Sequence, residues 1–217
     1  MSPRHATEKP RFRMKLTSAV VRLALERAWA YRFLQNVLVR SNTRQSLIGR
    51  YVQPRARDRI VDIGCGPADI LEHLPDVHYF GIDANPDYVR VARARYGARA
   101  NFIEGGLETL RDIPAASADI IMAIALLHHL DDGEANELFR EARRILAPGG
   151  RIFTIDCVTV ADQNPISRFL ISHDRGKYPR TPDGYRALAA PFFSNISQHH
   201  RNDMMRVPYD HLLMTCG

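Results

Sequence analysis

A glycine turn followed by an acidic residue is the part of this chain best suited to chemistry. The turn Gly64-Cys65-Gly66 comes directly after an apolar run that contains Asp62, and Asp83 ends the next apolar run, seventeen residues after Gly66. Glycine has no Cβ and tolerates positive φ, so the backbone of such a turn can approach a ligand closely. A carboxylate at the end of the following strand can accept hydrogen bonds from both hydroxyls of a ribose. This pattern predicts a site for an adenosine-containing cofactor.

Two acidic residues near the turn bear on which cofactor that is. Asp62 precedes the turn, and Asp69 lies at the start of the helix expected to follow it. Carboxylates repel the pyrophosphate of a dinucleotide, whereas they attract the ammonium and sulfonium groups of S-adenosylmethionine. Ala68 stands where a dinucleotide site usually has its third glycine, but this difference discriminates only weakly. The acidic residues favour S-adenosylmethionine, although the glycine turn alone is a weak signal.

The composition fits one domain with a short addition. The chain has 217 residues, of which 45% are hydrophobic, enough for a sizeable core. Its three cysteines are too few and too scattered for a disulfide framework or a zinc site, so we expect a cytoplasmic protein without a metal. No apolar stretch is long enough to cross a membrane, and the N-terminus lacks the pattern of a secretory signal. We therefore expect a soluble protein.

The net charge of +6 is unevenly distributed. Residues 1–59 hold 14 Lys and Arg against 3 Asp and Glu, whereas the rest of the chain holds 16 against 21. A basic region of this kind can attract nucleic acid, anionic lipid or an acidic substrate. The alternative is a solvated surface, because Arg22, Arg27 and Arg32 are spaced five apart and point in different directions on a helix.

The pattern of apolar residues divides the chain near residue 54. Residues 1–54 are expected to form an N-terminal helical cap, with a long amphipathic helix over 16–39 and a short one ending before Pro54. Residues 55–217 then alternate between strands and helices, which predicts a parallel sheet with helices on both faces. The expected strands are 60–63, 79–82, 101–104, 119–123 and 151–156, followed by an antiparallel pair near 195–200 and 206–215.

Five segments in this order resemble the class I S-adenosylmethionine-dependent methyltransferases that act on small molecules. The similarity covers about residues 55–217, and the segments are Val61–Gly66, Gly81–Asp83, Ala118–Ala123, Leu127–Leu130 and Leu146–Arg151. The resemblance implies a Rossmann-like three-layer α/β sandwich with a seven-stranded, mostly parallel sheet in the order 3-2-1-4-5-7-6, strand 7 being antiparallel. It also implies that S-adenosylmethionine lies across the carboxyl ends of the first strands and leaves as S-adenosylhomocysteine.

The resemblance also assigns residues to the parts of the cofactor. It places the methionine moiety beside Asp62, Gly64, Cys65, Gly66 and Ala123, the ribose on Asp83, and the adenine near Ala84, Gly106 and Leu107. Members of the family commonly carry an aspartate at the position of Gly106, and this chain does not. We therefore expect adenine to depend on backbone groups and apolar packing, with Glu108 as a weaker substitute.

Candidate residues for the methyl acceptor lie after the fourth and fifth expected strands. We predict that His128, Asp156 and Tyr178 are catalytic residues. If the acceptor is a hydroxyl group, the reaction would need one of them as a general base. Substrate-binding candidates are His129, Asp174, Arg175, Arg180 and Tyr31. Two alternatives stay open: the histidines can be structural, and Asp174 can form salt bridges with the arginines that fix the connection.

The sequence thus predicts an enzyme that transfers a methyl group from S-adenosylmethionine to a small molecule, an anionic one being considered because of the arginines. One alternative is a methyltransferase acting on RNA or another nucleic acid through the basic N-terminal region. Another is a non-catalytic protein that binds the cofactor or touches a membrane surface through the N-terminal helix.

Overall fold

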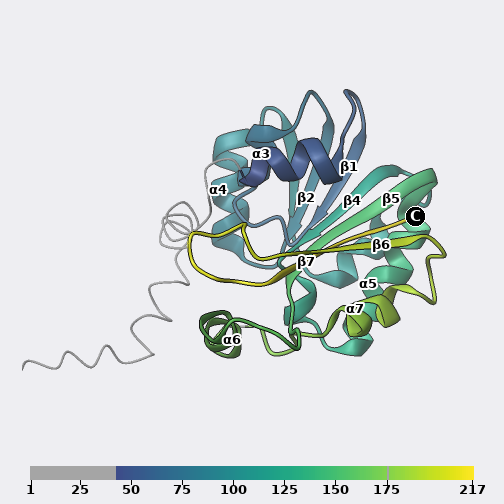
Figure 1. The fold of residues 1–217 in the computed structure, drawn as a ribbon. Coiled ribbons are helices and arrows are strands. Elements are labelled where there is room, and N and C mark those ends of the chain that lie inside the picture. Colours follow the sequence, from purple (N-terminus) through teal and green to yellow (C-terminus); the bar gives the residue numbers. More distant parts are fainter. Residues whose placement is uncertain (1–42, 175) are drawn as a thin grey trace, which may run out of the picture.

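Seven strands form one continuous sheet in the computed structural model, which describes residues 43–174 and 176–217 (Figure 1). The order is β3-β2-β1-β4-β5-β7-β6, as predicted. The first five strands pair in parallel, and β7 pairs antiparallel with both β5 and β6. The strands are β1 (Arg59–Ile63), β2 (His78–Asp83), β3 (Ala100–Glu104), β4 (Ala118–Ile124), β5 (Leu146–Cys157), β6 (Ile196–Arg201) and β7 (His211–Cys216).

Helices cover both faces of the sheet, so its central strands are buried on both sides. In β4, Ile120 and Met122 face one core while Ile121 and Ala123 face the other, because successive side chains of a strand point in opposite directions. The first core is completed by α3 (Thr43–Leu47), the π-helical turn η1 (Ile48–Val52), the 3₁₀ helix η2 (Asp69–His73) and α4 (Pro86–Tyr96). The second is completed by the 3₁₀ helix η3 (Leu107–Asp112), α5 (Asp132–Ile145) and α7 (Pro182–Ala189).

Local capping residues set where the helices begin. The Asn85 side chain accepts hydrogen bonds from the first turn of α4, where Pro86 is the first residue. Asp131 and Glu134 form a capping box at the start of α5, and Thr181 caps α7. A further helix, α6 (Pro165–Ser172), lies in the connection after β5 and stands apart from the sheet in Figure 1.

Several elements differ from the sequence prediction, most of all β5, which begins at Leu146 rather than near Arg151. The segment after the glycine turn forms only the five-residue helix η2, since Pro75 and the start of β2 leave no room for more turns. β4 continues through Ile124, one residue further than expected. β7 begins at His211 rather than near Arg206, because Pro208 has no N–H to donate to a neighbouring strand.

The predicted N-terminal cap is described only in part. Leu47, Ile48 and Val52 pack into the core of the sheet domain, so residues 43–52 are attached to it directly. Residues 1–42, with the helix expected over 16–39, lie outside the described residues, and the division at residue 54 stays a prediction. None of the helices over 43–174 and 176–217 is long and apolar enough to cross a membrane.

Candidate active site

The glycine turn joins β1 to η2 and is folded so that its own N–H groups are already used. Gly64 and Gly66 have φ values of 72° and 54°, which residues with a Cβ rarely adopt. The N–H groups of Gly64 and Cys65 both donate to the Ile82 carbonyl, at 2.8 and 2.9 Å. The N–H of Gly66 donates to Asp83 Oδ2 at 2.8 Å, and the other Asp83 oxygen accepts from the Asn85 N–H at 2.8 Å. Asp83 is thereby fixed beside the turn.

This arrangement argues against a pyrophosphate at the turn. A bound diphosphate needs free N–H groups and the N-terminus of a helix, whereas the three N–H groups of residues 64–66 are taken and η2 has only five residues. A Cβ at Gly66 would meet no atom within 4 Å, so the turn leaves open space beside its backbone. Asp69 does not supply the free negative charge expected of it, because it forms an ion pair with Arg95.

Asp62 is the one polar side chain in the buried run of β1. It is 2% exposed, and its Oδ2 accepts a hydrogen bond from the Tyr79 hydroxyl at 2.5 Å. Its Oδ1 has no hydrogen-bond partner among the described residues. Burial raises the pKa of Asp62 to about 7, although the hydrogen bond from Tyr79 acts in the opposite direction. A buried carboxylate oxygen without a partner at this place fits an ammonium group of a ligand.

The loop after β4 brings His128 into a second buried polar group. His128 lies in the 3₁₀ turn η4 (Leu127–His129) and is 5% exposed. Its Nδ1 lies 2.7 Å from Asp156 Oδ1, and its Nε2 lies 3.6 Å from Asp174 Oδ1. Tyr209, from the segment before β7, donates to the second Asp174 oxygen at 3.0 Å. Four chain segments therefore meet at His128.

The charges of this group are strongly coupled. Burial alone would lower the pKa of His128, but its hydrogen bond to Asp156 and the negative charges of Asp156 and Asp174 raise it to about 9. Burial raises the pKa of Asp156, whose second oxygen has no partner among the described residues. For Asp174, burial is outweighed by His128 and by the Gly176 N–H, so its pKa lies well below the ordinary value.

Sequence comparison shows where this architecture belongs. Residues 60–150, which include the turn, Asp62, Asp83 and His128, match the family model of a methyltransferase domain. This part of the chain is therefore similar to the methyltransferase domain of the class I S-adenosylmethionine-dependent methyltransferases. The prediction of S-adenosylmethionine as the cofactor is confirmed at the level of the family.

Relatives with assigned names match parts of this chain. The 27-O-demethylrifamycin SV methyltransferase of Amycolatopsis mediterranei is 35% identical over 114 residues, covering 49% of this chain and 41% of that protein. A ubiquinone biosynthesis O-methyltransferase of Cupriavidus pinatubonensis is 28% identical over 157 residues, covering 68% of this chain and 59% of that protein. The chain thus spans about half the length of these relatives.

Solved structures share the fold of this chain at low sequence identity. The phosphoethanolamine N-methyltransferase 2 of Haemonchus contortus, in complex with phosphomonomethylethanolamine and S-adenosylhomocysteine, superposes with a TM-score of 0.71 at 14% identity, covering 87% of this chain and 56% of that one. An S-adenosylmethionine-dependent methyltransferase from Archaeoglobus fulgidus has a TM-score of 0.67 at 18% identity, covering 87% and 100%.

The residues predicted around adenine occupy the ends of β2 and β3. Ala84 is exposed, and Leu107 is partly buried against the core. The Glu108 carboxylate accepts a hydrogen bond from the Gly106 N–H at 2.8 Å, and a Cβ at Gly106 would lie 2.6 Å from Glu108 Oε2. Glu108 therefore fills the space that a side chain at residue 106 would need, and the Gly106 N–H is engaged by it.

Ala123, predicted beside the methionine moiety, lies inside the fourth strand and not at its end. It is fully buried within β4, where it pairs with Thr154 of β5. Ala125 is the exposed residue just past the strand, with a φ of 54°. The extra residue of β4 explains the shift, and a positive φ at alanine has no signal in the sequence.

Arg180 was expected to bind substrate, but in the structure it forms hydrogen bonds within the protein. Its Nε and Nη2 donate to Asp132 Oδ1 at 3.0 and 2.7 Å, and its two terminal nitrogens donate to three carbonyls, of Leu127, Leu130 and Tyr178. These bonds use all five donors of a guanidinium. Arg180 therefore has no donor left for an anionic substrate, and it ties the His128 loop to the connection before α7.

The other residues predicted to act on the substrate lie in different surroundings. Tyr178 is exposed, and its N–H donates to the His128 carbonyl at 2.9 Å. His129 is exposed next to His128, with the two ring centroids 4.2 Å apart. Of the ion pairs expected for Asp174, the one with Arg180 is not formed, because Arg180 pairs with Asp132 and Asp174 contacts His128. Arg175 and Tyr31 lie outside the described residues.

Sequence reasoning missed two residues near this group. Tyr209 contacts Asp174, and His211 stacks beside Tyr209 with ring centroids 4.9 Å apart. Burial lowers the pKa of His211 to about 4, so the ring is neutral, and its Nδ1 lacks a partner among the described residues. Both residues reach the site only because β7 inserts beside β5, a long-range pairing that no local motif encodes.

A hollow of about 600 Å³ lies at the opposite end of the sheet from the glycine turn. It is lined by residues at the amino ends of β1, β2 and β3, among them Arg59, His78 and Ala100. In open parallel sheets, ligands bind at the carboxyl ends of the strands. We therefore do not assign the cofactor or the acceptor to this hollow.

Proposed function

We propose that this protein transfers the methyl group of S-adenosylmethionine to a small-molecule acceptor and releases S-adenosylhomocysteine. The observation that carries the proposal is the pairing of the glycine turn with two carboxylates. Asp83 is oriented by backbone N–H groups and retains lone pairs for ribose hydroxyls, while Asp62 keeps an oxygen free in the buried strand beside it. Both features suit a cofactor with one ribose and an ammonium group.

The protein supplies alignment and water exclusion in this reaction, because the sulfonium already carries an activated leaving group. Asp62 and Asp83 hold the two ends of the donor. Of the predicted catalytic residues, His128 and Asp156 hydrogen-bond each other and are buried, which suits positioning of the η4 loop. Tyr178 is exposed at the same loop and stays our candidate for direct contact with the acceptor.

We propose a neutral acceptor with a hydroxyl group. Four carboxylates, Asp62, Asp83, Asp156 and Asp174, lie at or near the carboxyl ends of the strands against a single imidazolium, His128, and Arg180 is fully engaged. An anionic acceptor would face this negative field without the arginine that the sequence offered for it. Relatives named as a 27-O-demethylrifamycin SV methyltransferase and as a ubiquinone biosynthesis O-methyltransferase support oxygen as the methylated atom.

A methyl-transfer assay with labelled donor tests this proposal. The full-length protein is incubated with methyl-labelled S-adenosylmethionine and either a low-molecular-mass extract or purified total RNA. We expect label in the small-molecule fraction, with Asp83→Asn reducing it and Asp76→Asn, a surface carboxylate away from the turn, leaving it unchanged. Label confined to RNA would contradict the small-molecule assignment.

Methylation of RNA is a second candidate with its own support. The 14 Lys and Arg against 3 Asp and Glu over residues 1–59 can bind phosphates, and a ribosomal RNA large subunit methyltransferase G of Streptomyces avermitilis is 32% identical over 111 residues. This function requires RNA binding that weakens steeply as salt rises, since each neutralised phosphate releases counterions. A filter-binding titration at two salt concentrations tests it.

We place the protein in the cytoplasm, where its three unpaired cysteines stay reduced. Contact with a membrane surface through the basic N-terminal region is the remaining alternative. The helix predicted over 16–39, which would make this contact, lies outside the described residues. Co-sedimentation with anionic vesicles tests that contact. A non-catalytic role would show as cofactor binding without turnover in the labelled assay.

A further inference from the structure

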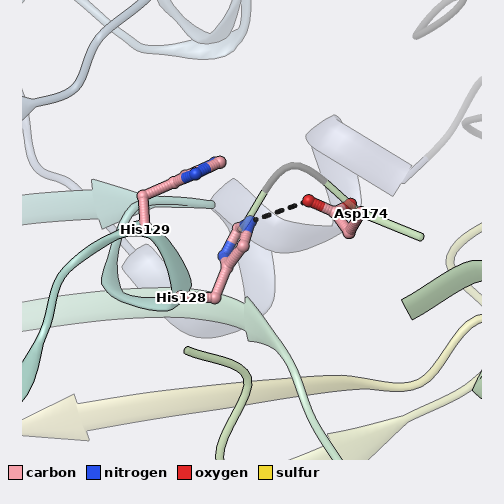
Figure 2. Close-up of side chains that lie close together, drawn as sticks. All are labelled: His128, His129 and Asp174. Atoms are coloured by element: carbon pink, nitrogen blue, oxygen red, sulfur yellow. Dashed lines mark ion pairs between the residues drawn. The ribbon is translucent and has the colours of Figure 1, made fainter. Parts of the chain in front are cut away.

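His128, His129 and Asp174 form a group of metal-ligating side chains that the sequence did not suggest. One ligand atom from each lies within 4.8 Å of the others (Figure 2). Figure 2 shows the outer nitrogen of His128 facing the Asp174 carboxylate, with the His129 ring beside the His128 ring. We propose that these three side chains bind a divalent transition-metal ion, with Zn²⁺ as the first candidate.

The separation between His128 and Asp174 suits two ligands of one ion. His128 Nε2 lies 3.6 Å from Asp174 Oδ1, which is too long for a hydrogen bond. Two ligands bound tetrahedrally to Zn²⁺ at about 2.0–2.1 Å lie roughly 3.3–3.4 Å apart. The two atoms therefore need to move by only a few tenths of an ångström to share an ion.

The surroundings of His128 are those of a metal-binding histidine. Its Nδ1 contacts Asp156 Oδ1 at 2.7 Å, which holds a proton on Nδ1. An ion that binds at Nε2 displaces the second proton of the ring, as metal binding to histidine does in general. Asp156 is itself held, because its Oδ1 also accepts from the His128 backbone N–H at 3.1 Å. A carboxylate behind the ligating imidazole fixes the ring and makes it a better ligand.

Asp174 is held in a comparable way. The Tyr209 hydroxyl donates to its Oδ2 at 3.0 Å, and the Gly176 N–H donates to its Oδ1 at 2.9 Å. Oδ1 faces His128 and retains a lone pair for an ion. The carboxylate is therefore oriented by contacts that an ion does not need to break.

His129 is the third ligand and is exposed beside His128. Its ring plane is inclined at 39° to that of His128, and one of its ligand atoms lies within 4.8 Å of those of His128 and Asp174. Two imidazoles and a carboxylate suit Zn²⁺, Fe²⁺ or Ni²⁺, whereas Mg²⁺ and Ca²⁺ prefer ligand sets made of oxygen. Three protein ligands also leave at least one position open, as in zinc sites that bind water or substrate.

The site lies close to the glycine turn. Leu126, two residues before His128, packs against Gly64, where a Cβ would lie 3.2 Å from Leu126 Cδ1. The open position of the ion can hold a water molecule. That it can also take a hydroxyl of the methyl acceptor rests on the proposed function, whereas metal binding itself does not.

Titration with Co²⁺ and Zn²⁺ tests the site directly. Full-length protein without an affinity tag is treated with chelator, and Co²⁺ binding is followed by its visible absorption, Zn²⁺ and Mg²⁺ binding by calorimetry. We expect one Co²⁺ or Zn²⁺ per chain and no competition by Mg²⁺. His129→Ala and Asp174→Asn should each weaken binding roughly tenfold or more, and Tyr209→Phe, which removes the support of Asp174, by about tenfold.

His173→Ala is the matched control, because His173 is an exposed histidine beside Asp174 whose Nδ1 contacts the Phe169 carbonyl at 2.8 Å. It should bind Co²⁺ like the unaltered protein, and circular dichroism checks that every variant is folded. Failure to bind Co²⁺ and Zn²⁺, or binding that His129→Ala and Asp174→Asn leave intact, overturns the proposal. Calorimetry with S-adenosylhomocysteine on the same samples separates this result from a failure of the proposed function.

Discussion

Substitution of Asp83 is the most direct test of the cofactor site by a change of one residue. Its two oxygens accept N–H groups from Gly66 and Asn85, which leaves lone pairs directed away from the turn. Asp83→Ala should weaken binding of S-adenosylhomocysteine by about 1 to 3 kcal/mol, corresponding to one or two lost hydrogen bonds. Calorimetry measures the change, with Asp76→Ala as the exposed control, and an unaltered affinity would show that Asp83 does not bind the ribose.

Asp62 makes cofactor binding depend on pH. Burial raises its pKa to about 7, and only the ionised carboxylate attracts an ammonium group. We predict that affinity for S-adenosylhomocysteine rises from about pH 5.5 to 7, below the range where the cofactor's own amino group loses its proton. Because the folded pKa lies above the ordinary 3.8, Asp62 contributes most to the stability of the protein alone at low pH, and this contribution is lost as pH rises through 7.

The matched variant for this pH dependence is Asp62→Asn, which keeps the size of the side chain and does not ionise. It should bind the cofactor weakly at every pH, with a flat profile. An affinity that falls over the same range in the unaltered protein would contradict the role of the Asp62 carboxylate.

The proximity of the glycine turn to Asp83 was predictable because the two are close in sequence. The turn and Asp83 belong to two consecutive strands, so spacing alone brings them together. His128, Asp156, Asp174 and Tyr209 come from four separate segments, and only the sheet topology unites them. Arg180 shows the opposite error: its residue type suggested an anion site, but Asp132 and three carbonyl groups engage all of its donors.

At the scale of elements, Arg180 ties η4 to the connection before α7. Its side chain is 11% exposed, and Arg180→Ala would leave three carbonyl groups without their donor. We predict a loss of about 2 to 4 kcal/mol in the free energy of unfolding, measured in urea, because buried acceptors without partners are costly.

Arg168→Ala is the control for this loss, since Arg168 is exposed on α6. It should change the free energy of unfolding by less than about 0.5 kcal/mol. Equal stability of the Arg180 and Arg168 variants, with methyl transfer lost only in the first, would show that Arg180 binds substrate instead.

The residues at which the helices begin can be predicted from the sequence, whereas the bounds of η2 and β7 cannot. Asn85-Pro86 and Thr181-Pro182 encode their caps locally, so the helices begin where these pairs stand. The short η2 and the late start of β7 depend on the space left by neighbouring elements and on Pro208. Local patterns do not contain that information.

In the molecule as a whole, the parallel sheet explains why the candidate functional residues lie at one end of the strands. The carboxyl ends of β1, β2, β4 and β5 meet there, which brings Asp62, Asp83, His128 and Asp156 to the same side. The strand order was predicted from the family resemblance and is confirmed. The acceptor was not predictable, because the segments facing it come from connections whose paths no periodic pattern fixes.

Calorimetric titration of the full-length protein with S-adenosylhomocysteine, S-adenosylmethionine and NAD tests whether the glycine turn binds S-adenosylmethionine rather than a dinucleotide. The N–H groups of the glycine turn are occupied and Asp62 and Asp83 stand beside it, so the site should accept a cationic adenosyl cofactor and reject a pyrophosphate. We predict one molecule of S-adenosylmethionine or S-adenosylhomocysteine bound per chain and no binding of NAD. Binding of NAD without binding of either adenosyl compound would contradict the account.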